Sequence, residues 1–302
     1  ARTARIAFAA FASLTIFPLS ANASGYLSAR FGSDQGHPAI PNAYAVYFNP
    51  AALGGATGTE LTLDATLAYR TASYQRNPNA LSPSVESQKS SQAYVDANTG
   101  KATLSNVLAS PFFGAFTDLG TRSFRLGFAS YIPFGGQASW SKTDAADPVV
   151  ADGPQRWHVI DGRIVAWYNT LAASYTYAPA RLSIGVSVSA VKHDLETVRA
   201  RNSNGSDDVT TTDGSLVEGR SYVTASGVNL AAAIGVHWEP LDDHRLRLGA
   251  SYSIRPGFGE MRLRGTLKQQ FGGVAAPAPE TPIDFLQQYP DVLRVGGTYR
   301  PL

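Results

Sequence analysis

The feature that most constrains this chain is the strict alternation of apolar and polar residues over long stretches. Between positions 60 and 70, one parity carries Leu61, Leu63, Ala65, Leu67 and Tyr69, and the other carries Glu60, Thr62, Asp64, Thr66, Ala68 and Arg70. The same pattern returns at 181–190, 227–238 and 245–255. A period of two is typical of a β-strand with two unlike faces, because successive side chains point to opposite sides. The chain is therefore predicted to be all-β.

The composition of the two faces indicates a membrane protein. The polar parity is rich in Ser, Gly, Thr and Arg, and charged residues make up only 16% of the chain, against about 25% in soluble domains. The apolar parity carries aromatic residues such as Tyr69, Trp167 and Trp238. Such strands fit a transmembrane antiparallel β-barrel, whose apolar face meets lipid and whose backbone groups all pair within the closed sheet. A soluble β-sandwich is the alternative.

Loop lengths favour the barrel. We expect eight strands, which lie at about 59–74, 104–118, 123–135, 164–178, 181–198, 222–238, 245–268 and 291 to the end of the sequence. The intervening connections alternate between long and short, and the long ones cover 77–101, 136–163, 199–221 and 269–290. Outer-membrane barrels sort their loops in this way, with short turns on the periplasmic side and long loops outside the cell.

The first 58 residues do not alternate and divide into two parts. Arg2 and Arg5 precede an apolar run over 6–19 that ends in Ala21-Asn22-Ala23. This arrangement predicts a secretory signal peptide over 1–23, cleaved after Ala23. Residues 24–58 are then either a disordered lead-in or a plug that folds into the barrel lumen, and 59–302 form the barrel.

Several functions are disfavoured. A formal net charge of +2 is too small for a protein that binds nucleic acid through phosphate contacts, and the absence of Cys excludes disulfides and thiolate chemistry. The chain has five histidines, but the sequence contains no Gly-x-Ser-x-Gly elbow that would supply a nucleophilic serine. The acidic residues Asp207, Asp208 and Asp213 lack the EF-hand spacing and predict a solvated loop. We therefore expect neither an enzyme nor a bound cofactor or metal.

Five short segments carry a family resemblance. Asn49-Pro50-Ala51, within the run Tyr47-Phe48-Asn49-Pro50-Ala51-Ala52-Leu53, resembles a signature of the FadL/TodX family of outer-membrane transporters for long-chain fatty acids and other hydrophobic compounds. Its position between a signal peptide and the first strand strengthens the match. The segments 131–135, 182–186 and 248–252 are also similar to that family, as is 290–299.

The resemblance implies a barrel of about fourteen strands with an N-terminal hatch, of which about eight strands lie in this sequence and the C-terminal ones are missing. It implies passive, hatch-gated uptake of long-chain fatty acids or other hydrophobic compounds. In such proteins the substrate is captured among the extracellular loops, moves to a lumen pocket and is released laterally at a kinked strand as the hatch rearranges. The resemblance further implies a location in the outer membrane of a Gram-negative bacterium, with membrane lipid and lipopolysaccharide as neighbours, and a monomer. The alternative is a general diffusion porin with an open, water-filled lumen.

Candidate site residues follow from these expectations. The resemblance assigns Asn49, Pro50 and Ala51 to the hatch, where Asn49 is expected to hold a turn by hydrogen bonds. Pro cannot donate to a β-ladder and Gly permits a bend, so a lateral gate is expected at the end of the third strand. The gate candidates are Pro133, Gly135 and Gly136. The parity of the strands places arginines toward the lumen, where they could bind a carboxylate headgroup. Those headgroup candidates are Arg125, Arg247 and Arg255, with Arg262 and Arg264 on the same expected face.

Overall fold

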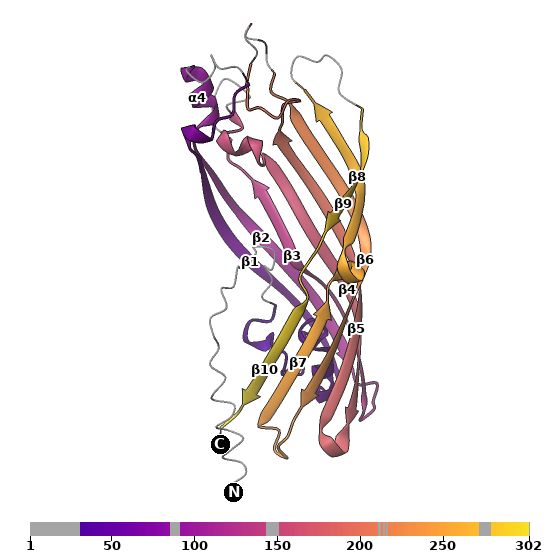
Figure 1. Ribbon diagram of the computed structural model, residues 1–302. Coiled ribbons are helices and arrows are strands. Elements are labelled where there is room, and N and C mark those ends of the chain that lie inside the picture. The colour runs from indigo at the N-terminus through magenta and orange to yellow at the C-terminus, as the bar shows by residue number, and fades with distance from the viewer. Residues whose placement is uncertain are drawn as a thin grey trace.

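A computed structural model describes residues 31–84, 91–142, 151–210, 213, 215, 217–271 and 279–301. These residues form one antiparallel sheet that curls into a half-barrel (Figure 1). Its strands are β1 (Thr59–Arg76), β2 (Gly100–Thr117), β3 (Phe124–Ser139), β4 (Asp161–Tyr177), β5 (Leu182–Ala200), β6 (Arg220–Trp238), β7 (Leu246–Ile254), β8 (Met261–Gln270), β9 (Thr281–Gln287) and β10 (Val292–Tyr299). The prediction of a curled antiparallel sheet is confirmed.

The strands follow one another around the sheet in chain order from β1 to β7. Beyond β6 the sheet divides into two halves. In the view of Figure 1, the lower half continues through β7 to β10, and the upper half continues through β8 to β9. β7 with β8, and β9 with β10, thus act as two long strands that are each broken near the middle. The eight-strand layout is preserved in this sense.

The connections are sorted between the two ends of the sheet, as the loop lengths predicted. The short turns over 118–123, 178–181 and 239–245 lie at one end, and Leu119, Arg181 and His244 adopt positive φ there. The long connections lie at the opposite end, together with the helix α4 (Figure 1). The helical segments are η1 (Ser33–Gln35), α2 (Ala45–Phe48), η2 (Pro50–Gly55), η3 (Pro78–Ala80), α4 (Gln92–Asn98), η4 (Pro154–Trp157), η5 (Ala178–Ala180) and η6 (Pro256–Gly259).

The two faces of the sheet differ as the alternation requires. The convex face exposes large apolar side chains almost completely: Leu63 is 83% exposed, Leu67 69% and Leu171 68%. An apolar surface of this extent is the mark of a face that something other than water covers. The concave face carries the opposite parity, including Ser183, Ser187 and Ser189, which are buried.

The inner segment, residues 31–58, accounts for much of that burial. It carries η1, α2 and η2 and packs against the concave face of β3 to β7, near the end with the short turns (Figure 1). Glycines make this approach possible: a methyl group at Gly185 would overlap the backbone of Pro50 and Ala51, and one at Gly249 would overlap Pro38. Glycine is the residue that lets a second backbone come this close.

One strand prediction is wrong. The single strand expected over 245–268 is broken by η6, where Gly257 and Phe258 adopt left-handed φ values of 75° and 53°. Pro256 cannot donate to a ladder and its glycine neighbour favours positive φ, so the chain leaves the sheet there. Odd-numbered residues face inward on both sides of the break, but beyond it the odd positions carry the apolar residues. Arg262 and Arg264 consequently point to the convex face, and Met261 and Leu263 are fully buried on the concave one.

Two expected loops are partly strand. β3 continues through Gly135 and Gly136 to Ser139, so both glycines lie inside the strand rather than beyond its end. Within the connection expected over 269–290, residues 281–287 form β9 and pair with β8. Pro282 lies in this strand, which is tolerated because β9 pairs with β8 alone among the described strands.

Other expectations fall outside what the structure covers. The signal peptide predicted over 1–23 and the first residues of the hatch, 24–30, lie outside the described residues. Within the described part of the chain, no helix has both the length and the apolar character needed to cross a membrane.

The close approach of the inner segment to the wall can be tested at a glycine. Gly185→Ala should displace η2, because the new methyl group meets backbone rather than a flexible side chain. We expect faster cleavage within residues 31–58 in limited proteolysis, while the β-sheet signal in circular dichroism stays unchanged. Gly297→Ala is the matched control, since its methyl group would meet chiefly the movable Leu248 side chain. Equal cleavage of both variants would contradict the packing described.

Candidate functional site

Asn49 makes three hydrogen bonds, two within the inner segment and one to the wall. Its side chain is fully buried, and Nδ2 donates to the carbonyl oxygens of Pro38 at 2.8 Å and of Val236 in β6 at 2.9 Å. Its Oδ1 accepts from the Ala51 amide at 3.1 Å, so Asn49 also caps η2, whose first residue is Pro50. The Asn49 side chain therefore pairs three backbone groups, at Pro38, at the start of η2 and in β6.

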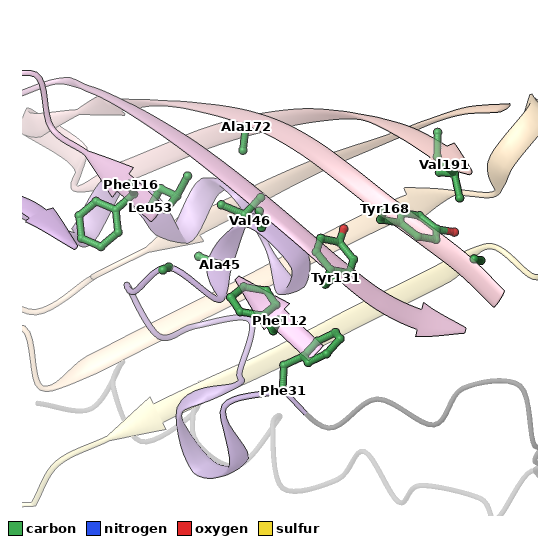
Figure 2. Close-up of a cluster of buried hydrophobic side chains, with 14 of the residues drawn as sticks. Phe31, Ala45, Val46, Leu53, Phe112, Phe116, Tyr131, Tyr168, Ala172 and Val191 are labelled. Atoms are coloured by element: carbon green, nitrogen blue, oxygen red, sulfur yellow. The ribbon is translucent and has the colours of Figure 1, made fainter. Parts of the chain in front are cut away.

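An aromatic cluster fills the concave side above η2. Phe31 packs on Phe112 with ring centroids 5.1 Å apart, and Tyr131 stacks on Tyr168 at 5.5 Å. Figure 2 shows these rings with Val46 and Leu53 of the inner segment, between α2, η2 and the strands β2 to β4. Burial of large aromatic surfaces is a strong stabilising contribution, so the cluster fixes the segment to this side of the sheet.

The wall has a gap between β2 and β3. Their backbone ladder covers 112–117 against 126–131, and β3 then undergoes a register shift between Tyr131 and Phe134. The next backbone contact is the bridge between Leu104 and Trp140. Between these points side chains span the gap: Asn106 Nδ2 donates to the Gln137 carbonyl at 2.9 Å, and Arg70 contacts the same oxygen. The predicted gate residue Pro133 lies within the register shift.

A large open cavity lies on the concave side above the register shift. Its volume is about 590 Å³, well above the roughly 150 Å³ that holds a benzene molecule in a protein. Apolar side chains of β4, β5 and β9 line it together with the glycines of β3. The lining includes Gly135, Gly136, Ile164, Leu195, Ile283 and Phe285, with Arg70 and Arg199 at its polar parts. We call this space the upper cavity.

A much smaller cavity lies below it, against the inner segment. Its volume is about 40 Å³, close to the space that one water molecule occupies in the liquid. Pro133 and Tyr131 line it from β3, Tyr47 from α2, and Arg255 and Arg294 from the far side. The Arg294 guanidinium lies 4.5 Å from the Tyr47 ring centroid, a cation–π contact. This lower cavity cannot hold an organic molecule unless a wall moves.

The wall has a second break, where both long strands leave the sheet. β7 gives way to η6, and β10 begins after the break at 288–291. Asp291 bridges the two sides: its carboxylate accepts from the Arg255 amide and Nε, both at 2.9 Å, and from the Tyr252 hydroxyl at 2.8 Å. The carboxylate thus replaces ladder hydrogen bonds that neither chain supplies.

All three headgroup candidates already have protein partners. Arg125 is buried and donates Nε to the Ala56 carbonyl at 2.7 Å, where it holds the end of the inner segment. Arg247 lies 3.2 Å from Glu239 beside the short turns, and Arg255 pairs with Asp291. Of the three, Arg255 alone lines a cavity described above. The structure therefore brings Arg255 and Pro133 to the lower cavity, and separates Arg125 and Arg247 from both.

The long loops form a cap over the upper end of the sheet. Arg156 of η4 is fully buried and pairs with the fully buried Glu218 at 2.9 Å. Its Nη2 donates at 2.9 Å to the Asn98 side chain after α4, so one guanidinium ties three loops together. Buried charges persist only when paired and hydrogen-bonded in this way.

The acidic loop is not solvated, contrary to the expectation from its sequence. Asp207 and Asp208 are buried because they bind the first long loop: Asp207 accepts from the Ser82 amide at 2.9 Å, and Asp208 from the Ser84 amide at 3.1 Å. Burial, together with a hydrogen bond to Asp207, raises the pKa of Tyr94 in α4. The two carboxylates therefore fasten loops rather than face solvent.

Several residues around the cavities escaped the sequence analysis. Tyr289 was assigned to a loop, and nothing in its neighbourhood alternates. Phe134 stands in the quoted 131–135 segment, but its inward direction depends on the register shift, which the sequence does not announce. Arg294 was detectable, because it has lumen parity in the alternating run at 292–299.

Comparison of the fold with solved structures finds similar barrels. A Pseudomonas aeruginosa FadL homologue is 18% identical, with a TM-score of 0.51 over 78% of this chain and 52% of that one. The Ralstonia pickettii toluene transporter TbuX is 15% identical, with a TM-score of 0.54 over 86% and 63%. The Pseudomonas putida toluene transporter TodX is 17% identical, with a TM-score of 0.50 over 91% and 64%.

These matches confirm the resemblance to the FadL/TodX family at the level of the fold. The chain spans between about half and two thirds of the length of these structures. No model of a known protein family matches the sequence, and no curated protein matches it significantly. The structural neighbours are transporters and channels, and none of those described here is an enzyme.

Replacing Asn49 should release the inner segment from the wall. Asn49→Ala leaves the Pro38 and Val236 carbonyls and the Ala51 amide without that partner, at about 1–3 kcal/mol for each group that stays buried. We expect faster amide hydrogen exchange over residues 38–55. Asn42→Ala is the control, because Asn42 bonds within the segment, to Gln35 and Tyr44. Similar exchange in both variants would argue against a special role for Asn49.

The loop cap should depend on charge balance. Arg156→Met leaves Glu218 buried beside Arg220 without its main partner, which costs about 3–5 kcal/mol for a buried pair. We expect rapid protease cleavage of the long loops in this variant. Adding Glu218→Gln removes the uncompensated charge and should restore part of the resistance. No recovery in the double variant would show that the other hydrogen bonds of Arg156 hold the cap.

Proposed function

We propose that this chain is part of an outer-membrane transporter of the FadL/TodX type, which takes up hydrophobic compounds passively. The observation that supports this best is a roomy, largely apolar upper cavity that lies beside an unpaired seam of the wall, with the inner segment filling the lumen farther down. Long-chain fatty acids are one substrate class that fits, and small aromatic hydrocarbons, as in the names of two structural neighbours, are another.

Capture follows from the hydrophobic effect. An apolar molecule gains about 0.8 kcal/mol for each CH₂ group that it buries, and the upper cavity has room for several groups without rearrangement. The exposed apolar convex face fits contact with membrane lipid, and we expect a monomer with lipopolysaccharide around its upper part. None of these steps needs a cofactor, a metal or a covalent step.

Release is proposed to run sideways through the gap between β2 and β3. Pro133 prevents a ladder hydrogen bond at the register shift, and Gly135 and Gly136 leave the path beside it free of side chains. The inner segment serves as the hatch, with Asn49, Pro50 and Ala51 as its hinge to the wall. Because the lower cavity is too small for a ligand, passage downward requires the segment or the aromatic cluster to move.

A general diffusion porin is less compatible with this arrangement. A porin needs an open aqueous lumen, whereas the inner segment here packs on the concave face of five strands and is tied to β6 by Asn49. The residues that a porin would place at a charged constriction are partnered in this chain, as Arg125 and Arg255 illustrate.

The lateral route can be tested with a reversible cross-link, because the chain contains no natural Cys. Leu104→Cys with Trp140→Cys places a disulfide across the seam between β2 and β3, where these two residues form an isolated antiparallel bridge. In cells that make the whole protein, we expect oxidation to reduce uptake of a radiolabelled long-chain fatty acid or toluene at least about fivefold, and reductant to restore it.

The matched control is a disulfide inside an intact ladder, Leu171→Cys with Val188→Cys, which are paired neighbours of β4 and β5. This cross-link should leave uptake unchanged. Undiminished uptake with the gap closed would refute lateral release at this seam. Large steady ion conductance of the purified protein, without binding of either compound, would instead favour a porin.

A further inference from the structure

A layer of side chains lies between the upper cavity and the lower one. Along β5, Leu195 lines the upper cavity and Ser189 the lower, with Val191 and His193 between them. Along the 281–294 stretch, Phe285 lies above and Pro290 below. The same level can be followed through the register of neighbouring strands, since Phe134 pairs with Ala166, Ala166 with His193 and His193 with Gly227.

An aromatic contact spans this layer from one side of the lumen to the other. Tyr289, from the break before β10, stacks on Phe134 at the register shift of β3, with ring centroids 4.9 Å apart and an interplanar angle of 13°. The Tyr289 ring also covers His193, at 5.4 Å. We call Phe134, Tyr289, His193, Asn229, Met261 and Leu263 the septum. A molecule that descends from the upper cavity meets the septum before it reaches the inner segment.

The septum contains polar atoms that the protein leaves unused. His193 is fully buried on the concave face, and neither ring nitrogen has a hydrogen-bond partner of acceptable geometry among the described residues. Asn229 Nδ2, on the neighbouring strand β6, is also buried and has no hydrogen-bond partner among the described residues. Val191, two residues before His193, pairs with Asn229, which places the two side chains on adjacent rows.

Such an arrangement is costly unless something binds there. Burying a polar group without a hydrogen-bond partner costs about 1–3 kcal/mol of stability. Sites that keep such groups strongly favour ligands that form the missing hydrogen bonds. A neutral imidazole offers one donor and one acceptor, and the Asn229 amide adds a donor. The septum carries no Lys or Arg, so a carboxylate would lose its hydration there without gaining a counter-charge.

We propose that the septum is a selectivity site for aromatic molecules that carry a neutral hydrogen-bonding group, such as a phenolic hydroxyl. Tyr289 moves off Phe134 to admit the ring, and the hydroxyl then bonds to His193 and Asn229. This inference rests on the proposed function, because it assumes that hydrophobic molecules enter the upper cavity. It adds that the chain prefers a phenol to the hydrocarbon of the same shape.

The test compares three matched probes on the whole protein in detergent: 4-butylphenol, butylbenzene and 4-butylbenzoate. Affinities are measured by equilibrium dialysis for the wild type, His193→Leu and His193→Phe. We expect both variants to lose about tenfold in affinity for 4-butylphenol, the loss of one to two net hydrogen bonds. Affinity for butylbenzene should change by less than about twofold. His244→Leu is the control, since His244 lies in the short turn over 239–245, pairs with Glu239 and lines neither cavity.

The outcomes separate the two proposals. Equal loss of both neutral probes in the His193 variants, or no loss of either, overturns the selectivity site and leaves hydrophobic transport standing. Tightest binding of 4-butylbenzoate by the wild type overturns it as well. Failure of the wild type to bind any probe overturns the proposed function with it. His193→Phe keeps a ring in the septum, and circular dichroism verifies that each variant is folded.

Discussion

Pairing of the backbone polar groups is the constraint on which the rest of this structure depends. A sheet that exposes an apolar convex face has no water on that side to satisfy its N–H and C=O groups, so each break in its ladder needs a substitute. At the gap between β2 and β3 the substitutes are the side chains of Asn106 and Arg70. At the break around η6 the substitute is the Asp291 carboxylate.

The same constraint explains how the inner segment is held. Asn49 supplies an amide to a strand carbonyl and a carbonyl to a helix amide, which a purely apolar contact could not do. Hydrophobic packing of Phe31, Val46 and Leu53 also holds the segment against the wall, but this contact does not fix its orientation as a hydrogen bond does. The segment thus combines directional hydrogen bonds to the wall, including those from Ser251 to Phe48 and from Arg125 to Ala56, with hydrophobic contact over its length.

The fold was predictable from the sequence to the extent that it follows from local alternation. Seven of the eight expected strands are present near their expected positions, because each is a continuous two-faced run between turn residues. The remaining one, expected over 245–268, is broken at η6. Beyond the break the apolar positions face inward, so assigning the polar positions to the lumen placed Arg262 and Arg264 on the wrong face. The strand β9 was hidden by Pro282, which is compatible with a strand that pairs on one side among the described strands.

The site was less accessible from sequence, because its geometry comes from contacts between distant segments. Asn49 was found through a motif, and Pro133 through the chemistry of proline. Tyr289 and His193 meet only because the break before β10 faces the register shift of β3, about 155 residues away along the chain. The arginines were identified by parity, but parity does not reveal that Arg125 already binds Ala56 or that Arg255 binds Asp291.

The glycines behind the inner segment have a consequence for the calibre of any passage there. At the level of η2 the wall presents Gly127, Gly185, Gly235 and Gly249, so no side chain at these positions narrows the bore. If the segment withdraws, the free cross-section at those positions is limited by the backbone itself. On the proposed uptake route, the width of the passage at this level would therefore depend on the position of the inner segment and not on side chains of the wall at these four positions.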